Sequence, residues 1–512
     1  MSGSGRPAVV DGQGGTGSAG TIPGPVRRDP GPAWLPLVPA ALTLLAGLYK
    51  ITGSSYSHDE TATVAAVHRS FAQLVRMLGN VDVVHGAYYA LIWLVARVGG
   101  SSELVVRLPS AVAMAVAAGF VAALGRRLGS AWAGLAAGLG FAVLPSVSWY
   151  AQNAREGALI TALAVLATYC LLRALESSGG AWRWLTGYGV VLAALGLANL
   201  FSLLLVVAHA VTLGWSRRDY RLDRRFVLGW FAAVAAAVIV VSPVAVVGYQ
   251  ELHQIHWIKA PGLPILLGLQ QLAGDRPVFI LALAIIACAV AVSLIPRTAP
   301  LRPGHWTAGL VRFCLPWLLL PPAILMTASL AHPVYTFRYI VYCIPALALL
   351  LGAALTALGR YAGPVALVLM IVAGLHTQIA QRRPDSRGIN IRAADNVVAR
   401  HQKPGDALLN FSAHRGPATA SGERTIETAY PYGLDRLRDI STGVSPQQSG
   451  TLSGTYAPAS LIRQRLAQVS RLWVVEWRPR PVPVLRGSGF TLVRSWKVKG
   501  LLLRLYIRQG KP

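Results

Sequence analysis

The sequence has few charged residues for a chain of 512 residues, and acidic side chains are especially scarce. Charged residues make up 13% of the chain, with 20 Asp and Glu against 47 Lys and Arg, whereas hydrophobic residues make up 54%. This composition excludes an ordinary soluble protein and indicates an integral membrane protein. The net charge of +27 would suggest nucleic acid in a soluble protein. Here much of the excess lies in short loops, where it indicates topology and contact with anionic lipid.

Cysteine is also scarce, and its spacing argues against two kinds of site. The four cysteines all lie in apolar runs, without zinc spacing and without the pattern of a disulfide framework. No His-x-x-x-His or Cys-x-x-Cys pair indicates a metal, so we expect His253, His256 and His332 to be solvated or hydrogen-bonded. We therefore expect no metal and no other cofactor, although the sequence leaves a divalent cation open.

Long apolar runs are abundant. Runs of about 18 to 22 residues can cross about 30 Å of hydrocarbon, and we count about eleven of them between residues 33 and 384. The loop from Ser216 to Arg225 contains five arginines and should remain in the cytoplasm. The same rule places residues 1–32, a disordered tail rich in Gly, Pro and Ser, inside the cell, and residues 385–512 outside. The predicted spans cover residues 34–51, 105–124, 131–149, 157–175, 187–199, 201–214, 227–248, 277–295, 311–330, 338–358 and 362–380.

Residues 54–104 should form an extracytoplasmic loop with juxtamembrane helices. Residues 61–78 have helical periodicity, with Val64, Phe71 and Leu74 on an apolar face and Arg69 on the polar face, which predicts one helix lying on the membrane. The apolar segment from His85 to Val98 is short, so it is either a second juxtamembrane helix or a short span.

The part that follows the last span differs in kind. Residues 392–401 look helical, and residues 406–411, 472–477 and a hairpin within 489–508 look like strands. Residues 413–455 show no clear element and no catalytic motif. The predicted fold is therefore an all-α polytopic membrane protein of the plasma membrane with a small C-terminal extracytoplasmic α/β domain.

Two adjacent carboxylates, Asp59 and Glu60, directly follow the first apolar run. Carboxylates are costly near lipid, so a pair at this boundary suggests a function. The pair could also be merely solvated, and Ser57 to Glu60 also fits a capping box in which Glu60 caps the helix. Asp59 is not needed for that box.

The predicted topology gathers further polar groups at the outer face. A carboxylate there can act as general base, and arginines can hold a phosphate through two parallel hydrogen bonds. The set therefore suits a phosphorylated donor and a hydroxyl acceptor. Plainer interpretations stay open: Arg107 could pair with Glu103 one helical turn away, Arg155 could flank a span, and Arg338 could be a membrane anchor. The candidate site residues are Asp59, Glu60, His85, Tyr88, Arg107, Gln152, Arg155, Arg338 and Tyr339.

The order of these motifs resembles that of the GT-C glycosyltransferases, in the superfamily of protein O-mannosyltransferases and aminoarabinose transferases, and specifically actinobacterial-type mannosyltransferases. Besides the Asp-Glu pair, His85-Gly86-Ala87-Tyr88-Tyr89 resembles a family element that carries two prolines. The run Ser102 to Ala111 resembles the start of the second span. Tyr150-Ala151-Gln152-Asn153-Ala154-Arg155 resembles a family loop, with Glu156-Gly157 in place of Pro-Tyr, and Arg338-Tyr339 before Pro345 is a looser match.

The resemblance implies an inverting transfer from a polyprenyl-monophosphate sugar, with mannose expected, at the outer membrane face. Asp59 would be the general base, and Arg155, Arg338 and His85 would lie near the donor phosphate. The acceptor would be a lipoglycan, a cell-wall glycan or a protein. Two alternatives remain: a transporter or flippase for a lipid-linked sugar, and a catalytically inactive scaffold whose outer domain binds a partner.

Overall fold

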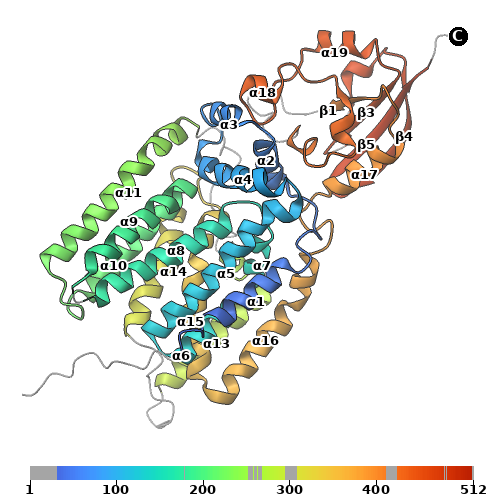
Figure 1. Ribbon diagram of the computed structural model, residues 1–512. Coiled ribbons are helices and arrows are strands. Elements are labelled where there is room, and N and C mark those ends of the chain that lie inside the picture. Colours follow the sequence, from blue (N-terminus) through green and yellow to red (C-terminus); the bar gives the residue numbers. More distant parts are fainter. Residues whose placement is uncertain are drawn as a thin grey trace, which may run out of the picture.

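The computed structural model describes residues 32–177, 179–251, 258, 262, 268–294, 308–410, 424–477, 479 and 481–509. These residues form a long helical body with a small α/β part at one end (Figure 1). His253 and His256 lie outside the described residues.

The helices follow one another along most of the chain. In order, the first are α1 (Leu37–Leu48), α2 (His58–Val67), α3 (Phe71–Leu78), the 3₁₀ helix η1 (Val83–His85), α4 (Gly86–Gly99), α5 (Glu103–Leu128), α6 (Ala131–Val143), α7 (Pro145–Ala151), α8 (Gly157–Glu176) and α9 (Ala181–Ala198). They are followed by η2 (Leu200–Leu204), α10 (Leu205–Ser216), α11 (Arg224–Gln250), η4 (Gly268–Leu272), α13 (Arg276–Leu294), α14 (Ala308–Ala328), η5 (Phe337–Cys343), α15 (Ile344–Ala357) and α16 (Gly359–Ala380).

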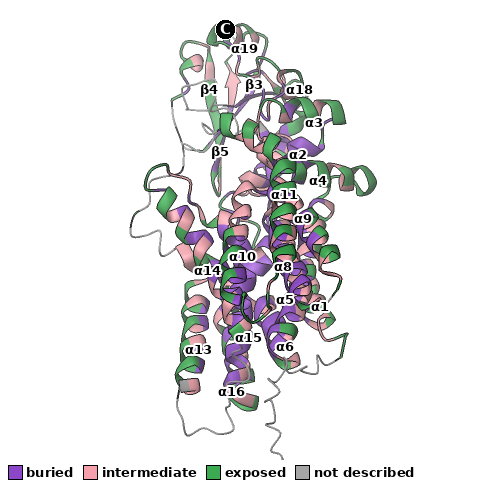
Figure 2. Cartoon of the chain, turned by 90° about the vertical axis from the view of Figure 1, so that its left-hand side faces the viewer, coloured by how far each residue is buried: buried purple, intermediate pink, exposed green. Residues whose placement is uncertain are grey.

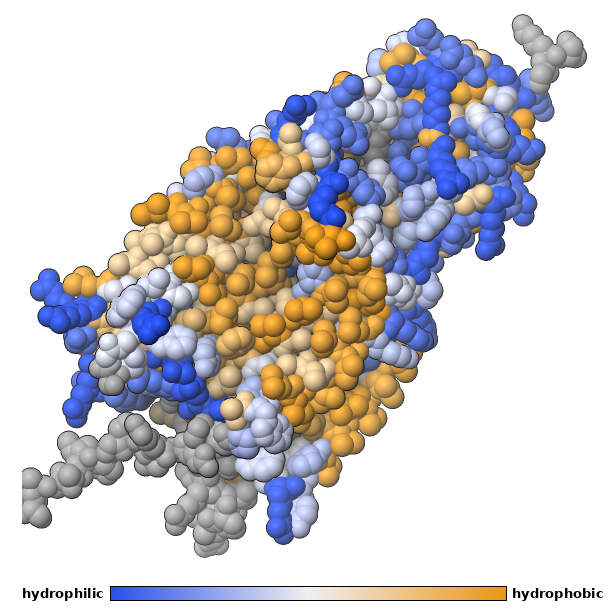
Figure 3. Space-filling model, viewed as in Figure 1, coloured by the Kyte–Doolittle hydropathy of each residue, from blue (hydrophilic) through white to orange (hydrophobic). Residues whose placement is uncertain are grey.

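Within the described residues, 7 helices are long and apolar enough to cross a membrane, or 8 if the bent pair α6 and α7 forms one span. The other predicted spans correspond to α1, α9 and α10, which do not reach that length or hydropathy. The space-filling view shows, on the face turned to the reader, a broad apolar area over the helical body between more hydrophilic ends (Figure 3). The chain is therefore a multi-pass membrane protein, as its composition predicts.

The helix α15 forms the centre of the bundle. In the segment from Phe337 to Ala357, 94% of the most apolar window is buried, and α15 is buried along its length in Figure 2. A helix that is apolar on every side packs inside a bundle. Gly352 permits the close approach of α6, because a Cβ there would lie 2.4 Å from the Ala137 backbone.

The single interfacial helix predicted over residues 61–78 is wrong, because the structure divides it into α2 and α3. The first helix ends at Val67, and Ser70 starts the second: its side chain accepts a hydrogen bond from the Gln73 N–H, and the Gln73 side chain accepts one from the Ser70 N–H, in a complete capping box. Such side chains offer the backbone an alternative to continuing a helix. The segment left open between juxtamembrane helix and span forms η1 and α4, and α4 lies beside α2 and α3 (Figure 1).

The C-terminal part is an α/β fold. Its sheet has the order β2-β1-β3-β5-β4, with β1 parallel to β2 and β3, and β5 antiparallel to β3 and β4. The predicted helix, strands and hairpin are confirmed, whereas several short elements occupy the stretch where none was expected. The elements are α17 (Ile391–His401), β1 (Ala407–Asn410), η6 (Arg424–Ile426), η7 (Leu434–Arg436), β2 (Arg438–Asp439), α18 (Pro446–Ser449), α19 (Ala459–Leu466), β3 (Arg471–Glu476), η8 (Pro483–Leu485), β4 (Phe490–Val498) and β5 (Leu501–Arg508).

The α/β part and the helices α2 to α4 share one hydrophobic core. Val64 of α2 and Tyr89 of α4 belong to the same buried cluster as Trp473 of β3 and Leu503 of β5. Arg69, predicted on a polar face, is 1% exposed, and its guanidinium donates hydrogen bonds to carbonyls of the α18 region. Burial of apolar surface stabilises this junction by about 25 cal/mol for each Å² removed from water. The α/β part therefore supports the segment that carries Asp59.

Candidate active site

Asp59 lies in the first turn of α2, where the sequence places it by helix capping. Ser57 accepts a hydrogen bond from the Glu60 N–H and Glu60 accepts one from the Ser57 N–H, which confirms the capping box. Asp59 takes no part in this box. Its carboxylate forms an ion pair with Arg338 of η5, a residue far away in the sequence. The side chains of Asp59 and Arg338 are 41% and 38% exposed, so a substrate can reach both.

Glu60, the neighbouring carboxylate, is fully buried and is held by four hydrogen bonds. Arg107 of α5 donates to it from Nε at 2.7 Å and from Nη2 at 3.1 Å. The backbone N–H groups of Ala154 and Ser57 donate at 3.0 and 2.8 Å. Burial alone would raise the pKa of the Glu60 carboxyl, but Arg107 lowers it to about 2. Glu60 is therefore an anchor between α2, α5 and the loop after α7, and it does not open to solvent.

The partner of Arg107 corrects one interpretation of the sequence. Arg107 does not pair with Glu103; besides Glu60, it binds the carbonyl oxygens of Ile51 at 2.8 Å and Ser54 at 3.0 Å. Glu103 pairs instead with Arg392 at the start of the α/β part. The guanidinium thus fixes the turn that leads into α2, and its own side chain is fully buried.

A second cluster forms around Arg155, in the loop between α7 and α8. Arg155 Nη1 donates to the Tyr89 hydroxyl at 3.0 Å, and Nη2 lies 3.0 Å from His85 Nε2. The other ring nitrogen of His85 lies 3.4 Å from a carboxylate oxygen of Glu156. Tyr89 in turn donates to Asp82 at 2.8 Å. Two of the predicted donor-binding residues, His85 and Arg155, are therefore in direct contact.

The two clusters interact electrostatically. Burial lowers the pKa of Arg155, but Tyr89, Glu156 and Asp59 together raise it well above its ordinary value. Burial raises the pKa of Glu156, but His85 and Arg155 lower it below its ordinary value by a larger amount. The charged forms of Arg155 and Glu156 are thus favoured, and Asp59 lies close enough to Arg155 to influence it.

Gly157 lies where the structure leaves no room for a side chain. A Cβ on Gly157 would lie 2.6 Å from the ring of Tyr150, so no larger residue fits without a shift. Gly157 stands where the resembling loop has tyrosine.

The remaining candidates take different positions. Tyr88 is 1% exposed, and its hydroxyl lies 3.3 Å from the Ser110 hydroxyl. Gln152 is 1% exposed and donates to the carbonyls of Gly47 at 2.9 Å and Tyr49 at 2.8 Å. Tyr339 is half-buried next to Arg338 and stacks with Phe201 at 4.7 Å between ring centroids. Their roles as substrate-binding residues stay predictions, and the contacts of Tyr88 and Gln152 are internal.

The structure adds residues that the sequence analysis did not select. Arg387 lies beneath the site, 3.8 Å from the Trp149 ring centroid, and donates to the Gln152 carbonyl at 2.8 Å. Trp477 follows β3, and its ring lies 5.6 Å from that of His58, the residue before Asp59. Arg387 and Trp477 lie far from α2 in the sequence, and neither stands in a motif. Among the described residues no group of three or more His, Cys, Asp or Glu side chains could hold a metal ion.

Comparison with known proteins gives matches in sequence and in structure. Residues 86–246 match the family model of dolichyl-phosphate-mannose-protein mannosyltransferases. The crystal structure of ArnT from Cupriavidus metallidurans in the apo state is similar with a TM-score of 0.61 and 12% identity, covering 92% of this chain and 97% of that chain. The same protein bound to undecaprenyl phosphate has a TM-score of 0.61 and 13% identity, with the same coverage. No curated protein matches the sequence.

The two kinds of match cover different parts of the chain. The family model covers α4 to α11 in sequence, and the ArnT fold covers the helical body and the C-terminal part together. The chain therefore has the GT-C fold of the ArnT structures over most of its length, and residues 86–246 resemble the dolichyl-phosphate-mannose-protein mannosyltransferases.

Proposed function

We propose that the protein is an inverting glycosyltransferase that moves mannose from a polyprenyl-monophosphate donor to an acceptor hydroxyl at the extracytoplasmic face of the plasma membrane. The observation that carries this proposal is the meeting of Asp59 and Arg338 beside the Arg155 and His85 cluster. The family description, which names a lipid-phosphate mannose donor, and the undecaprenyl phosphate bound by the similar ArnT structure support the donor class.

The reaction needs a base on one side of the sugar and cations on the other. Asp59 takes the proton from the acceptor hydroxyl, whose oxygen then forms a bond with the anomeric carbon. The bond between that carbon and the phosphate oxygen breaks, and the polyprenyl phosphate leaves with the electron pair. Arg155 and Arg338, with His85, stabilise the added negative charge.

The two adjacent carboxylates differ in solvent exposure, and a general base has to be exposed to reach the acceptor. Glu60 is fully buried with its two oxygens bound, so it has no path to an acceptor. Asp59 is 41% exposed and forms an ion pair with Arg338. When the phosphate draws the Arg338 guanidinium, Asp59 loses a neutralising cation and becomes a better base. Arg338 would thereby link donor binding to the readiness of the base.

The acceptor class follows from the setting of Asp59. Its neighbour His58 and Trp477 of the α/β part form an aromatic pair at the rim of the site, and such rings suit the apolar faces of sugars. We propose a lipoglycan, a cell-wall glycan or a protein as acceptor.

A transporter or flippase is the second candidate, because the fold is polytopic. Transporters place charges near the middle of the membrane on broken helices. In this protein His209 is buried inside the bundle. Its two ring nitrogens are hydrogen-bonded to the hydroxyls of Thr168 and Tyr188, each at 3.1 Å. The charged groups of the site gather instead at the end of the bundle that meets the α/β part, which favours transfer chemistry.

Asp59→Asn tests the proposal, because Asn keeps the shape and removes the basicity. Purified protein is mixed with radiolabelled polyprenyl-phosphate-mannose and membrane acceptors, and the rate of transfer is measured. Loss of a general base should reduce the rate by about 10²–10⁴-fold, with donor binding kept. Asp223→Asn is the matched control, because Asp223 caps α11 and Asn caps equally well. Transfer by Asp59→Asn at the parental rate would reject Asp59 as base and return the transporter and scaffold interpretations.

A further inference from the structure

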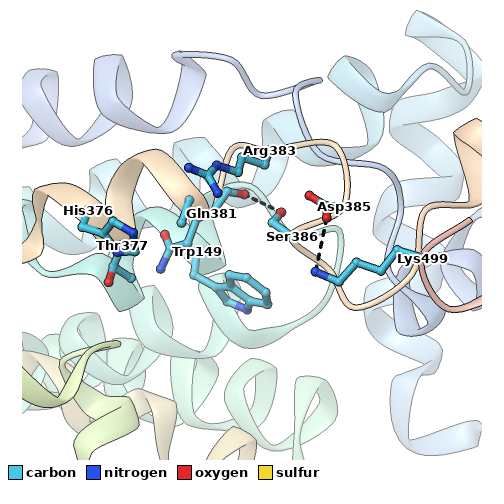
Figure 4. A pocket seen from close by; sticks show the side chains of 9 residues that line it. Trp149, His376, Thr377, Gln381, Arg383, Asp385, Ser386 and Lys499 are labelled. Carbon is cyan, nitrogen blue, oxygen red and sulfur yellow. Dashed lines mark hydrogen bonds and ion pairs between the residues drawn. The ribbon is translucent and has the colours of Figure 1, made fainter.

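A cavity, which we name the α16 cavity, lies apart from the residues of the candidate active site. Its volume is about 310 Å³, and none of the candidate site residues lines it. The lining side chains come from α7, from α16 and the segment after it, and from the turn between β4 and β5. Figure 4 shows Trp149 between the side chains of His376 and Gln381 on one side and the ion pair of Asp385 with Lys499 on the other.

The charges of this cavity leave a positive excess. Lys499 Nζ lies 3.3 Å from Asp385, so this cation and this carboxylate neutralise each other. Within the described part of the chain, the side chains of Arg383 and His376 have no hydrogen bond or ion pair. Arg387 does not line the cavity, but its guanidinium lies 3.8 Å from the centroid of the Trp149 ring. A bound anion would therefore find uncommitted donors.

The cavity also holds a buried acceptor without a partner. Gln381 is 8% exposed, and its Oε1 accepts no hydrogen bond from the described residues. Buried polar atoms are rarely left in this state in native structures. A ligand with a hydroxyl group beside its phosphate would satisfy Gln381 while the cations bind the phosphate.

Backbone carbonyl oxygens at the C-terminal end of α16 would repel an anion, but two of them already accept hydrogen bonds. Arg382 Nη1 donates to the Gln378 carbonyl at 2.5 Å, and the Ser386 hydroxyl donates to the Gln381 carbonyl at 2.7 Å. These bonds offset the negative end of the helix dipole.

The helix below the cavity presents an apolar face to lipid. Trp149, which lines the cavity, is the kind of residue that lies at the membrane surface. Acyl or polyprenyl chains along this face would bring their phosphate to Arg383. The exposed apolar residues of α16 are Val365, Val368, Leu369, Ile371, Val372, Leu375 and Ile379.

From these features we propose that the α16 cavity binds the phosphate headgroup of an anionic membrane lipid, separately from the donor bound at Asp59 and Arg155. Arg383 holds the phosphate, and Lys499 joins it, because the solvent-exposed ion pair of Lys499 with Asp385 is weak. Trp149 forms the wall, and Gln381 accepts from a headgroup hydroxyl. Through Trp149 and Arg387, which donates to the Gln152 carbonyl, the bound lipid would brace the loop that carries Arg155.

Lipid binding to the full-length protein in detergent tests the proposal without any transfer reaction. Phosphatidylglycerol and undecaprenyl phosphate are titrated in separate arms, and bound lipid is counted by native mass spectrometry. Arg383→Ala with Lys499→Ala should weaken binding of a phosphate lipid about tenfold or more, the effect of losing one hydrogen bond to a charged group. The arm that responds identifies the source of the phosphate.

The control is the charge-matched pair Arg360→Ala with Lys497→Ala. Arg360 lies at the opposite end of α16, and Lys497 lies two residues from Lys499 but does not line the cavity. Arg383 and Lys499 are exposed, so both double variants should fold, and equal melting temperatures verify this. Equal affinity of the two double variants for both lipids overturns the proposal. Because no sugar is transferred, that result would leave the function proposed for Asp59 untouched.

Discussion

Glu60→Gln is expected to destabilise the protein strongly, because it breaks the buried pair with Arg107. The amide oxygen can replace Oε1, which accepts from Arg107 Nε and from the Ala154 N–H. The amide NH₂ would take the place of Oε2 and face two donors, Arg107 Nη2 at 3.1 Å and the Ser57 N–H at 2.8 Å. The capping box of α2 is lost, and the Arg107 cation remains buried without its counter-charge.

The size of the effect follows in two ways. A pKa lowered from 4.5 to about 2 corresponds to about 3 kcal/mol in favour of the charged carboxylate. Removal of one partner from a buried ion pair costs about 3–5 kcal/mol in general. Both routes place the loss of unfolding free energy near 3 kcal/mol or above.

Thermal unfolding of the purified protein in detergent measures this loss. Glu176→Gln is the matched control, since Glu176 is 29% exposed and pairs with Arg127 at 2.6 Å. An exposed pair contributes about 0–1 kcal/mol, so the control should unfold close to the parent. If Glu60→Gln and Glu176→Gln unfold at the same temperature, the buried pair does not hold α2, and the anchor role of Glu60 is wrong.

Three further outcomes are expected. Arg155→Ala or Arg338→Ala should weaken binding of the polyprenyl-phosphate donor by about 1.5–3 kcal/mol, and Arg→Lys should restore only part; donor affinity equal to the parent would make these residues plain anchors. The lowered pKa of Glu60 means that its stabilisation is present above pH 4.5 and is lost as the pH falls toward 2. Acid unfolding curves of the parent and of Glu60→Gln should therefore converge at low pH, and parallel curves would contradict the ionised pair. A cysteine placed at Arg221 should resist an impermeant reagent added outside intact cells, because that loop is proposed to be cytoplasmic; labelling there would reverse the topology.

The local elements could be predicted because their signals are local. Apolar runs of membrane length, the capping box at Ser57 and the alternating strands of the C-terminal part depend on residues within a few positions of one another. The position of Asp59 and Glu60 is also a local feature, because both residues follow the first apolar run. For these features composition and periodicity suffice, since burial in lipid and helix capping act on neighbouring residues.

Only the tertiary structure shows which polar residues are buried and which partner each of them binds. Arg107 has Glu103 one turn away in sequence, yet it binds Glu60, because folding brings α2 against α5 and buries both charges together. Arg69 has the spacing of a solvated residue, yet the α18 region covers it. A buried charge must find a partner wherever the packing places one, and sequence spacing does not record that position.

The sequence by itself determined that this chain is a polytopic membrane protein with two adjacent acidic residues after its first apolar run and a mixed α/β part after its last one. Only the tertiary structure decided which of the two carboxylates is reachable, since Asp59 remains exposed beside Arg338 while Glu60 is buried. The physical reason is that capping fixes the turn of α2 from within, whereas exposure depends on α5, η5 and the α/β part, which pack against it from remote positions of the chain.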